Sequence, residues 1–440
     1  MGTVVTPAIA EDTIRQQQWH LEAMRAAEMW QVTKGQGVTV AVIDSGFKFD
    51  HPDLDGQFLP GKDFSGSPGG VGSFADGHGT AISSLIAGTG RGNGGTGAQG
   101  LAPGTKILPL KINTGKVGSL VSTDFLDQIG QSITYAVDQG AKVINISQGI
   151  EAVTALPADV AKLNGIIAGA RAKGVLVFAS VGNGADKGNL VEYPGALPGV
   201  VGVGASDQNG TVTAESERGP QVAFIAPGQD VMSACTGATG YCKSHGTSDS
   251  TALVSASAAL VWAVHKDWTG NQVLRVLINT AGKPNDGSPR NDIVGYGAVR
   301  PRIALTDPGD PGPADVSPIP VNTATPPVGL PSASSSVVAS AAPVPTESPT
   351  DVAAGGSTVQ PKAEGASGSG SAVPIVAGVV AGLVLVAGVV FAVVRRRRKP
   401  VVQSEIQAPP VSAQQPLGAV APPPPSYRPP VPPEDNPYAR

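Results

Sequence analysis

The sequence predicts an α/β fold in which helices cover both faces of a parallel central sheet. Short and nearly uninterrupted apolar runs recur between residues 11 and 306, as strands that are buried on both faces require. Segments with helical periodicity separate these runs, and this alternation is typical of parallel sheets. The chain of 440 residues is also long enough to bury a large core without disulfides or metals.

Five runs are expected to form buried strands, and five segments are expected to form helices. The strands are expected at 38–43 (VTVAVI), 143–146, 175–179, 200–203 and 222–225. The helices are expected at 80–87, 125–139, 158–173, 251–265 and 272–280. In folds of this class, active sites lie at the carboxyl ends of the strands.

Composition excludes several classes of protein. The net charge of -4 argues against a nucleic-acid-binding protein. Two cysteines are too few for a disulfide scaffold or for a Cys-rich zinc or iron–sulfur site. Neither an acidic calcium loop nor a His/Cys zinc spacing is present, so we expect no metal and no cofactor.

A membrane-spanning helix is predicted near the C-terminus. Residues 375–394 form an uncharged apolar run of the length that crosses a bilayer as a helix. Four arginines and a lysine follow at 395–399, and such basic clusters stay on the cytoplasmic side. A buried core helix does not account for this cluster. We therefore expect a single-pass protein of the cell membrane, with its bulk outside and residues 395–440 as a Pro-rich cytoplasmic tail.

The other segments divide around this helix and one folded domain, which is expected at 11–306. Residues 307–372 are rich in Pro, Ala, Ser and Gly and contain no aromatic residue, so we expect an extended extracellular linker. Residues 1–10 end in Ala8-Ile9-Ala10, which matches the small-residue pattern of a signal-peptide cleavage site. They are interpreted as the remnant of a signal peptide.

Three polar residues stand at junctions between a predicted strand and a predicted helix. Asp44 follows the first strand in VIDSG, His78 lies in DGHGTA, and Ser248 begins the helix in HGTSDSTALVSASAAL. A hydroxyl at a helix N-terminus suits nucleophilic chemistry, because free amides and the helix dipole favour negative charge. Such a serine needs a histidine base that a carboxylate orients. Taken singly, each residue could instead be a turn former, a packed histidine or a helix cap.

These three motifs resemble the signatures of the subtilisin-like serine proteases. VAVIDSG, GHGTAISSLIAG and GTSDSTALVSASAAL stand in the order of that family, which is also the order Asp, His, Ser. Further similar strings are GLAPGTKILPLKI, GAKVINISQG, VLVFASVGNGAD and YPGALPGVVGVGAS. The resemblance covers roughly residues 30–306. It implies a three-layer subtilisin-like fold and a serine endopeptidase that cleaves proteins or peptides.

The layout of the chain is similar to a narrower group, the mycosins, which are the anchored proteases of type VII secretion systems. An extracellular protease domain, a Pro-rich linker, one C-terminal helix and a basic-flanked tail follow one another in both. The lead-in IRQQQWHLEAMRAAEMWQVTKGQGVTVAVIDSG is also similar. This resemblance implies an association with the membrane complex of a type VII secretion system.

The resemblance implies a catalytic role for each matched residue. Asp44 would orient the histidine, His78 would be the general base, and Ser248 would be the nucleophile. Asn183, in SVGNGAD, matches the family's asparagine of the oxyanion hole, where it would act with the backbone N–H of Ser248. Its alternative role is that of a turn residue between glycines.

Two backbone segments and one carboxylate match the first specificity pocket of the family. Ser147-Gln148-Gly149 and Ser180-Val181-Gly182 match the segments that flank it, where glycine lets a peptide approach the backbone. Glu192, which precedes a Tyr-Pro pair, matches the residue at the base of the pocket. Either it accepts a basic side chain of the substrate, or it turns to solvent or pairs with a neighbour such as Lys187.

The sequence departs from the family pattern just after the nucleophile. Members usually carry Met-Ala and then a proline, whereas this chain has Asp249-Ser250 and then Ala252. The carboxylate of Asp249 could point to solvent, or it could disfavour the oxyanion and weaken the enzyme. His245 is a rival base three residues before Ser248, but it lacks the GHGT context.

Cys235 and Cys242 lie in the loop before the nucleophile, and outside the cell they can oxidise. A disulfide would stiffen that wall of the cleft, and two free thiols are the alternative.

The favoured function is thus a membrane-anchored extracellular serine endopeptidase. The alternative is a catalytically weak or silent protease-fold protein within a secretion complex. An esterase of the α/β-hydrolase type would need GxSxG and the order Ser, Asp, His, which this chain lacks. The expected partners are a protein or peptide substrate and the membrane, and no nucleic acid.

Overall fold

A sheet of seven parallel strands runs through the computed structural model, which describes residues 13–114, 122–320 and 437–438. The strand order is β2-β3-β1-β4-β6-β8-β9, and every neighbouring pair is parallel. The order reverses beside β1, and in such sheets ligands bind beyond the carboxyl ends of the strands at that point. The bounds are Lys62–Asp63 (β2), Lys106–Lys111 (β3), Thr39–Asp44 (β1), Val143–Ile146 (β4), Leu176–Ser180 (β6), Val201–Ser206 (β8) and Val222–Pro227 (β9).

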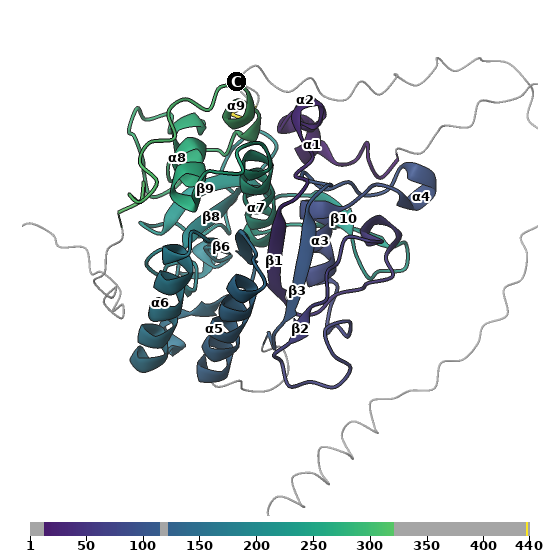
Figure 1. Cartoon of the computed structure of the whole chain (residues 1–440), viewed down its shortest axis with the longest axis horizontal. Helices are drawn as coiled ribbons and strands as arrows, with labels where there is room; N and C mark the ends of the chain where they lie inside the picture. Colours follow the sequence, from purple (N-terminus) through teal and green to yellow (C-terminus); the bar gives the residue numbers. More distant parts are fainter. Residues whose placement is uncertain (1–12, 115–121, 321–436, 439–440) are drawn as a thin grey trace, which may run out of the picture. The chain divides into compact units, whose positions relative to one another are not determined.

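Helices cover both faces of this sheet, in the three-layer α/β arrangement that the sequence predicts (Figure 1). One face carries α3 (His78–Ala87), α7 (Thr247–Val264) and α8 (Gly270–Thr280). The other face carries α5 (Ser122–Asp138) and α6 (Pro157–Ala172). Alternate side chains of strand β1 point to opposite faces of the sheet. Val40 and Val42 pack in the core beneath α3, α7 and α8, whereas Ala41 and Ile43 pack in the core beneath α5 and α6.

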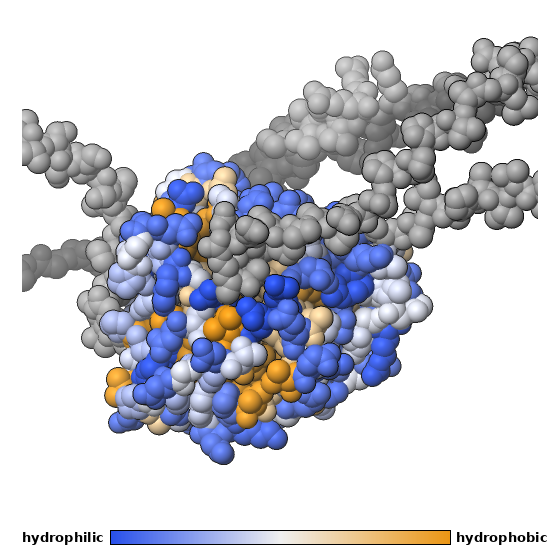
Figure 2. Space-filling view, turned by 90° about the horizontal axis from the view of Figure 1, so that it is seen from above, coloured by the Kyte–Doolittle hydropathy of each residue, from blue (hydrophilic) through white to orange (hydrophobic). Residues whose placement is uncertain are grey.

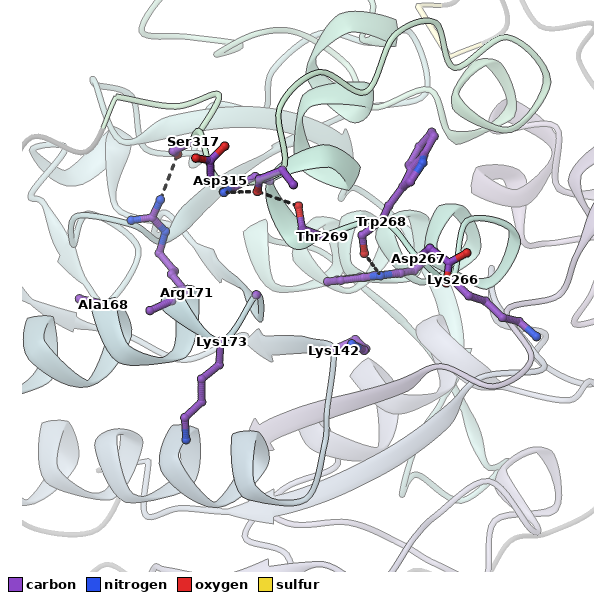
Figure 3. A pocket seen from close by; sticks show the side chains of 15 residues that line it. Lys142, Ala168, Arg171, Lys173, Lys266, Asp267, Trp268, Thr269, Asp315 and Ser317 are labelled. Carbon is purple, nitrogen blue, oxygen red and sulfur yellow. Dashed lines mark hydrogen bonds between the residues drawn. The ribbon is translucent and has the colours of Figure 1, made fainter.

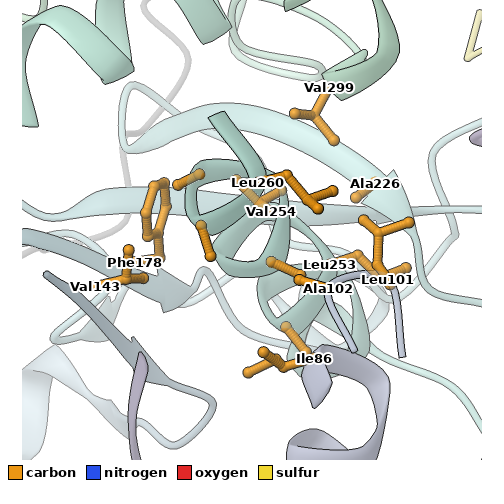
Figure 4. Packing of buried hydrophobic residues seen from close by; sticks show 14 of the residues in the cluster. Ile86, Leu101, Ala102, Val143, Phe178, Ala226, Leu253, Val254, Leu260 and Val299 are labelled. Atoms are coloured by element: carbon orange, nitrogen blue, oxygen red, sulfur yellow. The ribbon is translucent and has the colours of Figure 1, made fainter. Parts of the chain in front are cut away.

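Helix α7 lies at the centre of the larger core. Leu253, Val254 and Leu260 pack there together with Phe178 of β6 and Ile86 of α3 (Figure 4). A helix that is buried on all sides needs apolar or small residues all round, and the run TALVSASAALVWAV provides them. The first turn of α7, where Ser248 lies, therefore rests on a rigid support.

Short elements complete the described part of the chain. They are α1 (Trp19–Ala23), α2 (Ala26–Val32), α4 (Gly92–Gly95), α9 (Pro301–Thr306), the pair β5 (Ile150–Glu151) and β7 (Glu192–Tyr193), the pair β10 (Val231–Ala234) and β11 (Tyr241–Ser244), and the 3-10 turns η1 (Pro52–Leu54), η2 (Ala152–Thr154) and η3 (Ala185–Lys187).

Two stretches after α9 are fastened to this domain. Arg275 of α8 donates to the carbonyls of Pro311, Pro313 and Val316, which straps the start of the predicted linker to the domain. Tyr438 packs among Ala23, Ile225 and Ala298, and its hydroxyl bonds with that of Ser206. On the face that Figure 2 shows, the coloured surface is mostly polar, with separate apolar patches.

The predicted membrane helix at 375–394, most of the linker and residues 1–10 lie outside the described residues. Within the residues that are described, no helix is both long enough and apolar enough to cross a bilayer.

Candidate active site

Asp44 lies at the carboxyl end of β1 and is completely buried. Its Oδ1 accepts hydrogen bonds from the backbone N–H of Ser45, at 2.7 Å, and from the hydroxyl of the same residue, at 3.2 Å. These donors hold the buried carboxylate in one orientation. The switch point of the sheet thus presents a fixed carboxylate.

His78 begins α3 and faces this carboxylate. Its Nδ1 lies 2.8 Å from Oδ1 and 2.9 Å from Oδ2 of Asp44. Gly79 permits this approach, because a Cβ there would come within 2.5 Å of the carbonyl oxygen of Gly46 and 3.0 Å of the Cβ of Asp44. With Nδ1–H donating to Asp44, Nε2 of the neutral ring is left as a proton acceptor.

The charge of Asp44 also sets the proton affinity of this ring. Burial alone would lower the pKa of His78, but the carboxylate and its hydrogen bond outweigh burial and raise that pKa. The imidazolium that would form during proton transfer is therefore stabilised.

Ser248 lies in the first turn of α7 and exchanges two hydrogen bonds with Ser147, which follows β4. The Oγ of Ser248 donates to the carbonyl of Ser147 at 3.1 Å, and the Oγ of Ser147 donates to the carbonyl of Ser248 at 3.0 Å. Among the described residues no hydrogen bond joins Ser248 to His78. Rotation about the Cα–Cβ bond would redirect the hydroxyl, and such catalytic bonds are often unformed without substrate.

Asn183 lies beside the start of α7, where the sequence predicts it. Its Oδ1 accepts from the backbone N–H of Thr247 at 2.9 Å and from the hydroxyl of Thr247 at 3.1 Å. These two bonds orient the side chain so that Nδ2 is left to donate elsewhere. The exposed side chain of Asn183 is thus fixed to the residue that precedes Ser248.

Gln148 has a contact that the sequence did not predict. Its Nε2 donates to Oδ1 of Asp44 at 3.1 Å and lies 3.1 Å from Nδ1 of His78. The backbone of Gln148 was expected to flank the substrate pocket, and its side chain lies on the Asp–His pair. The sequence could not show this, because motif spacing says nothing of where a long side chain points.

The two residues that raised doubts about catalysis are both engaged with partners. Asp249 is buried, its Oδ2 accepts from the hydroxyl of Ser244 at 2.7 Å, and chiefly its burial raises its pKa to about 6. Its carboxyl therefore does not turn to solvent. The Nδ1 of His245 lies 2.9 Å from Oε1 of Glu215, at the surface. The rival base, His245, is thus paired with Glu215 through this ring nitrogen.

A disulfide joins Cys235 and Cys242, whose Cα atoms are 5.8 Å apart, so the disulfide prediction is confirmed. It links the residue after β10 to β11, in the hairpin that leads into α7. Thr236 of this loop touches Gly77, since a Cβ on Gly77 would lie 2.6 Å from its hydroxyl oxygen. The cross-linked loop thus supports the residue before His78.

A second acid that sequence reasoning missed lies near Glu192. Glu192 lies in β7, and Glu217 lies between β8 and β9 with 1% of its surface exposed. Burial, and then the charge of Glu192, raise the pKa of Glu217 to about 8. The string TAESERGP around Glu217 carries no motif, so only the fold brings the two acids together.

A cavity of about 700 Å³ lies away from the candidate active site (Figure 3). It is lined by Lys142 and Gly174, which precede β4 and β6, and by Arg171, Trp268 and Ser317. Because β1, β4 and β6 are parallel, this cavity opens at the edge of the sheet opposite to Asp44. It therefore takes no part in the candidate active site.

Comparison with known proteins decides the family. The sequence profile of the Subtilase family, peptidase S8, matches residues 35–297, which is more than half of the chain. The chain belongs to the subtilase family. It is 33% identical over 247 residues to an intracellular serine protease of Paenibacillus polymyxa, covering 55% of this chain and 71% of that protein.

Solved structures of mycosins resemble this subtilase. MycP1 from Mycobacterium smegmatis has a TM-score of 0.61 and 27% identity, over 71% of this chain and 90% of MycP1. The MycP3 protease of the type VII (ESX-3) secretion system has a TM-score of 0.59 and 27% identity, over 68% of this chain and 90% of MycP3. The subtilase is a serine endopeptidase by family, and its substrates are proteins or peptides.

Proposed function

We propose that this subtilase is a membrane-anchored extracellular endopeptidase in which Asp44, His78 and Ser248 form the catalytic triad. The hydrogen bond between Asp44 and Nδ1 of His78 carries the proposal, because it leaves Nε2 as the base. The hydroxyl of Ser248 would turn from Ser147 and give its proton to Nε2 as it attacks the peptide carbonyl.

The oxyanion of the tetrahedral intermediate would accept hydrogen bonds from Nδ2 of Asn183 and from the backbone N–H of Ser248. His78 would then give its proton to the leaving amine, and water would release the acyl group by the same route. Throughout, Asp44 would keep the ring oriented and balance its charge.

Active-site labelling tests this proposal. A serine-directed fluorophosphonate should label the wild type and not Ser248→Ala. Peptide hydrolysis should fall about 10⁴-fold in Asp44→Asn and by a similar order in His78→Ala, with double variants far from additive. His245→Ala is the matched control and should keep its activity. Near-normal activity in any of the three triad variants would overturn that assignment.

A catalytically weak or silent protein is the second candidate function. Two observations favour it: Ser248 bonds to Ser147, and the carboxyl of Asp249 is buried beside the nucleophile. A wild type that the probe leaves unlabelled, while a subtilase with a known serine nucleophile is labelled in parallel, would establish it.

The anchoring proposal includes the domains expected from the sequence, namely the protease domain at 11–306, the linker at 307–372, the membrane helix at 375–394 and a cytoplasmic tail. The apolar run and the basic cluster support it. Protease added to intact cells should digest the domain and spare a tag after Arg440. The contact of Tyr438 with the protease domain is incompatible with this anchoring. If the domain is outside the cell and the tail inside, Tyr438 cannot reach the domain. Digestion of the tag from outside would favour the contact over the anchor.

A partnership with a type VII secretion complex is the remaining part of the proposal. It is supported by the similarity to MycP1 and MycP3 and by the layout of the chain. Crosslinking in native membranes should join the tagged protein to membrane components of such a system, and a Ser248→Ala protein should crosslink equally well.

A further inference from the structure

Two acids, the buried Glu217 and the partly buried Glu192, contact the two backbone segments that flank the candidate substrate pocket. The carboxyl of Glu217 lies against Gly182, where a Cβ would come within 2.4–2.6 Å of its atoms. An oxygen of Glu192 lies against Gly149, 2.5 Å from the position of a Cβ. Glycine at both positions therefore leaves room for the two carboxyls beside these segments.

The position of Glu217 is fixed by its backbone. Its N–H donates to the carbonyl of Gly182 at 3.1 Å, and its side chain accepts a hydrogen bond from the backbone of Gly184. The other oxygen, Oε2, is buried and has no hydrogen-bond partner among the described residues. A buried carboxyl oxygen without a partner is costly, so the site is incomplete without a donor.

No cation of the described chain supplies that donor. The antiparallel pair β5–β7 places Glu151 opposite Glu192, which adds a third negative charge. Within 13–114, 122–320 and 437–438, no ion pair joins Lys187 or any other cation to Glu192 or Glu217. Burial, and next the charge of Glu151, raise the pKa of Glu192 to about 7. The uncompensated acids thus favour a cationic ligand.

We propose that Glu192 and Glu217 together bind the basic side chain, lysine or arginine, of the substrate residue just before the scissile bond. This inference rests on the proposed function, whose nucleophile lies next to the same segments. An ammonium or guanidinium group would donate to the free Oε2 of Glu217 and to Glu192 by charge-assisted hydrogen bonds. It would also relieve the repulsion between the two acids.

A metal ion is the competing occupant, and the geometry favours the side chain. Calcium binds six to eight oxygens, commonly from several carboxylates. Among the described residues, no three acidic, histidine or cysteine side chains converge closely enough to hold a metal. Two acids at the base of a pocket beside a nucleophile fit one basic side chain instead.

Matched peptides that differ only at the residue before the cut test the proposal, with Lys, Arg, Met and Ala at that position. The wild type should prefer Lys or Arg over Met, which has a similar length, by about tenfold or more in kcat/KM. Glu192→Gln and Glu217→Gln should each lower kcat/KM for the Lys and Arg peptides far more than for the Ala peptide, so that most of this preference is lost. Glu215→Gln, a nearby acid that pairs with His245, is the control and should keep the preference.

Four results would overturn the inference. The wild type could cleave the Met peptide as well as the Lys peptide, or a glutamine variant could lower all peptides equally. Calcium could also stabilise the wild type but neither variant, which would assign the acids to a metal. If no peptide is cleaved, binding of the Lys and Met peptides to Ser248→Ala is compared, and equal Kd values overturn the inference. Fluorophosphonate labelling keeps these outcomes separate from a failure of the proposed catalysis.

Discussion

Gln148 shows how one side chain can adjust a catalytic pair without taking part in proton transfer. Its N–H donates to the same oxygen of Asp44 that lies 2.8 Å from His78. The amide of Gln148 therefore competes with His78 for the same carboxylate oxygen, and this weakens the attraction of Asp44 for the proton of His78. We regard Gln148 as a positioning residue.

Replacing this residue should change the pH profile of the enzyme. In Gln148→Leu the carboxylate loses a donor and attracts the imidazolium more strongly, so the pKa of His78 should rise further. Because the neutral ring is the base, the acid limb of kcat/KM should move to higher pH. The plateau should fall less than about tenfold, since all three triad residues remain.

The pH–rate profiles of the wild type, Gln148→Leu and Gln148→Asn check this prediction, and the shorter amide serves as the control for size. An acid limb that stays in place, or that moves to lower pH, would rule out this competition.

At the residue scale, the sequence predicted the positions that a motif fixes and missed those that only the fold brings together. Asp44, His78 and Asn183 lie in motifs that contain glycines, and in the structure Asp44 bonds to His78 while Asn183 bonds to Thr247. Glu217 stands in a polar loop without a pattern. Its importance comes from contact with Gly182, 35 positions earlier in the chain, and single-sequence reasoning cannot supply that contact.

At the scale of elements, the hairpin β10–β11 forms one wall beside the nucleophile. The disulfide closes a loop with a sequence separation of 7, and Thr236 within it rests on Gly77. The hairpin therefore connects the start of α7 with the start of α3.

Removing this cross-link should cost stability more than activity. The double variant Cys235→Ser, Cys242→Ser should lower the free energy of unfolding by about 2–3 kcal/mol, the loop-entropy value for so short a loop. The value of kcat/KM should fall less than about tenfold, because both triad helices keep their cores. Urea unfolding and peptide hydrolysis measure the two effects. The reduced wild type should behave like the variant, and unchanged unfolding in both would show that the loop is already rigid.

Most of the strongly apolar elements were predicted, and the irregular ones were not. Strands β1, β4, β6, β8 and β9 fall within two residues of their predicted ends or extend them slightly, and five predicted helices are present. Strand β3 was missed because Pro109 and two flanking lysines interrupt its pattern, although Pro109 pairs with Val42 in the parallel sheet. The β10–β11 hairpin was also missed, since its second strand is short and mostly polar.

For the whole molecule, the N-terminal segment behaves as part of the domain. Leu21, Met24 and Met29 are buried in the larger core, and Trp30 donates to the carbonyl of Leu101 at 2.9 Å. Gln18 donates to the carbonyl of Met232 at 3.2 Å. The segment that precedes the first strand thus packs on the domain.

Truncation tests whether the N-terminal segment stabilises the domain or inhibits it. Deleting residues 1–12 should leave the activity unchanged, and N-terminal sequencing of the active form should give a start at or before Gln18. Deleting residues 1–33 should abolish cooperative unfolding, because each large buried side chain that is lost costs about 2–5 kcal/mol. An active form that begins well beyond Gln18, or a gain of activity in the longer deletion, would contradict this view.

The strap between Arg275 and residues 311–316 determines where a mechanical load would enter the protein. If the linker is pulled by a membrane anchor, the force reaches the domain through three carbonyls held by one guanidinium and through the amide of Asn271, which holds the carbonyl of Ala314 at 3.0 Å. Helix α8 takes up that force, and Arg171, which borders the cavity at the far edge of the sheet, bonds to Ser317. These contacts lie at the edge of the sheet opposite to Asp44, so a pull on the linker would load α8 before it reached the cleft.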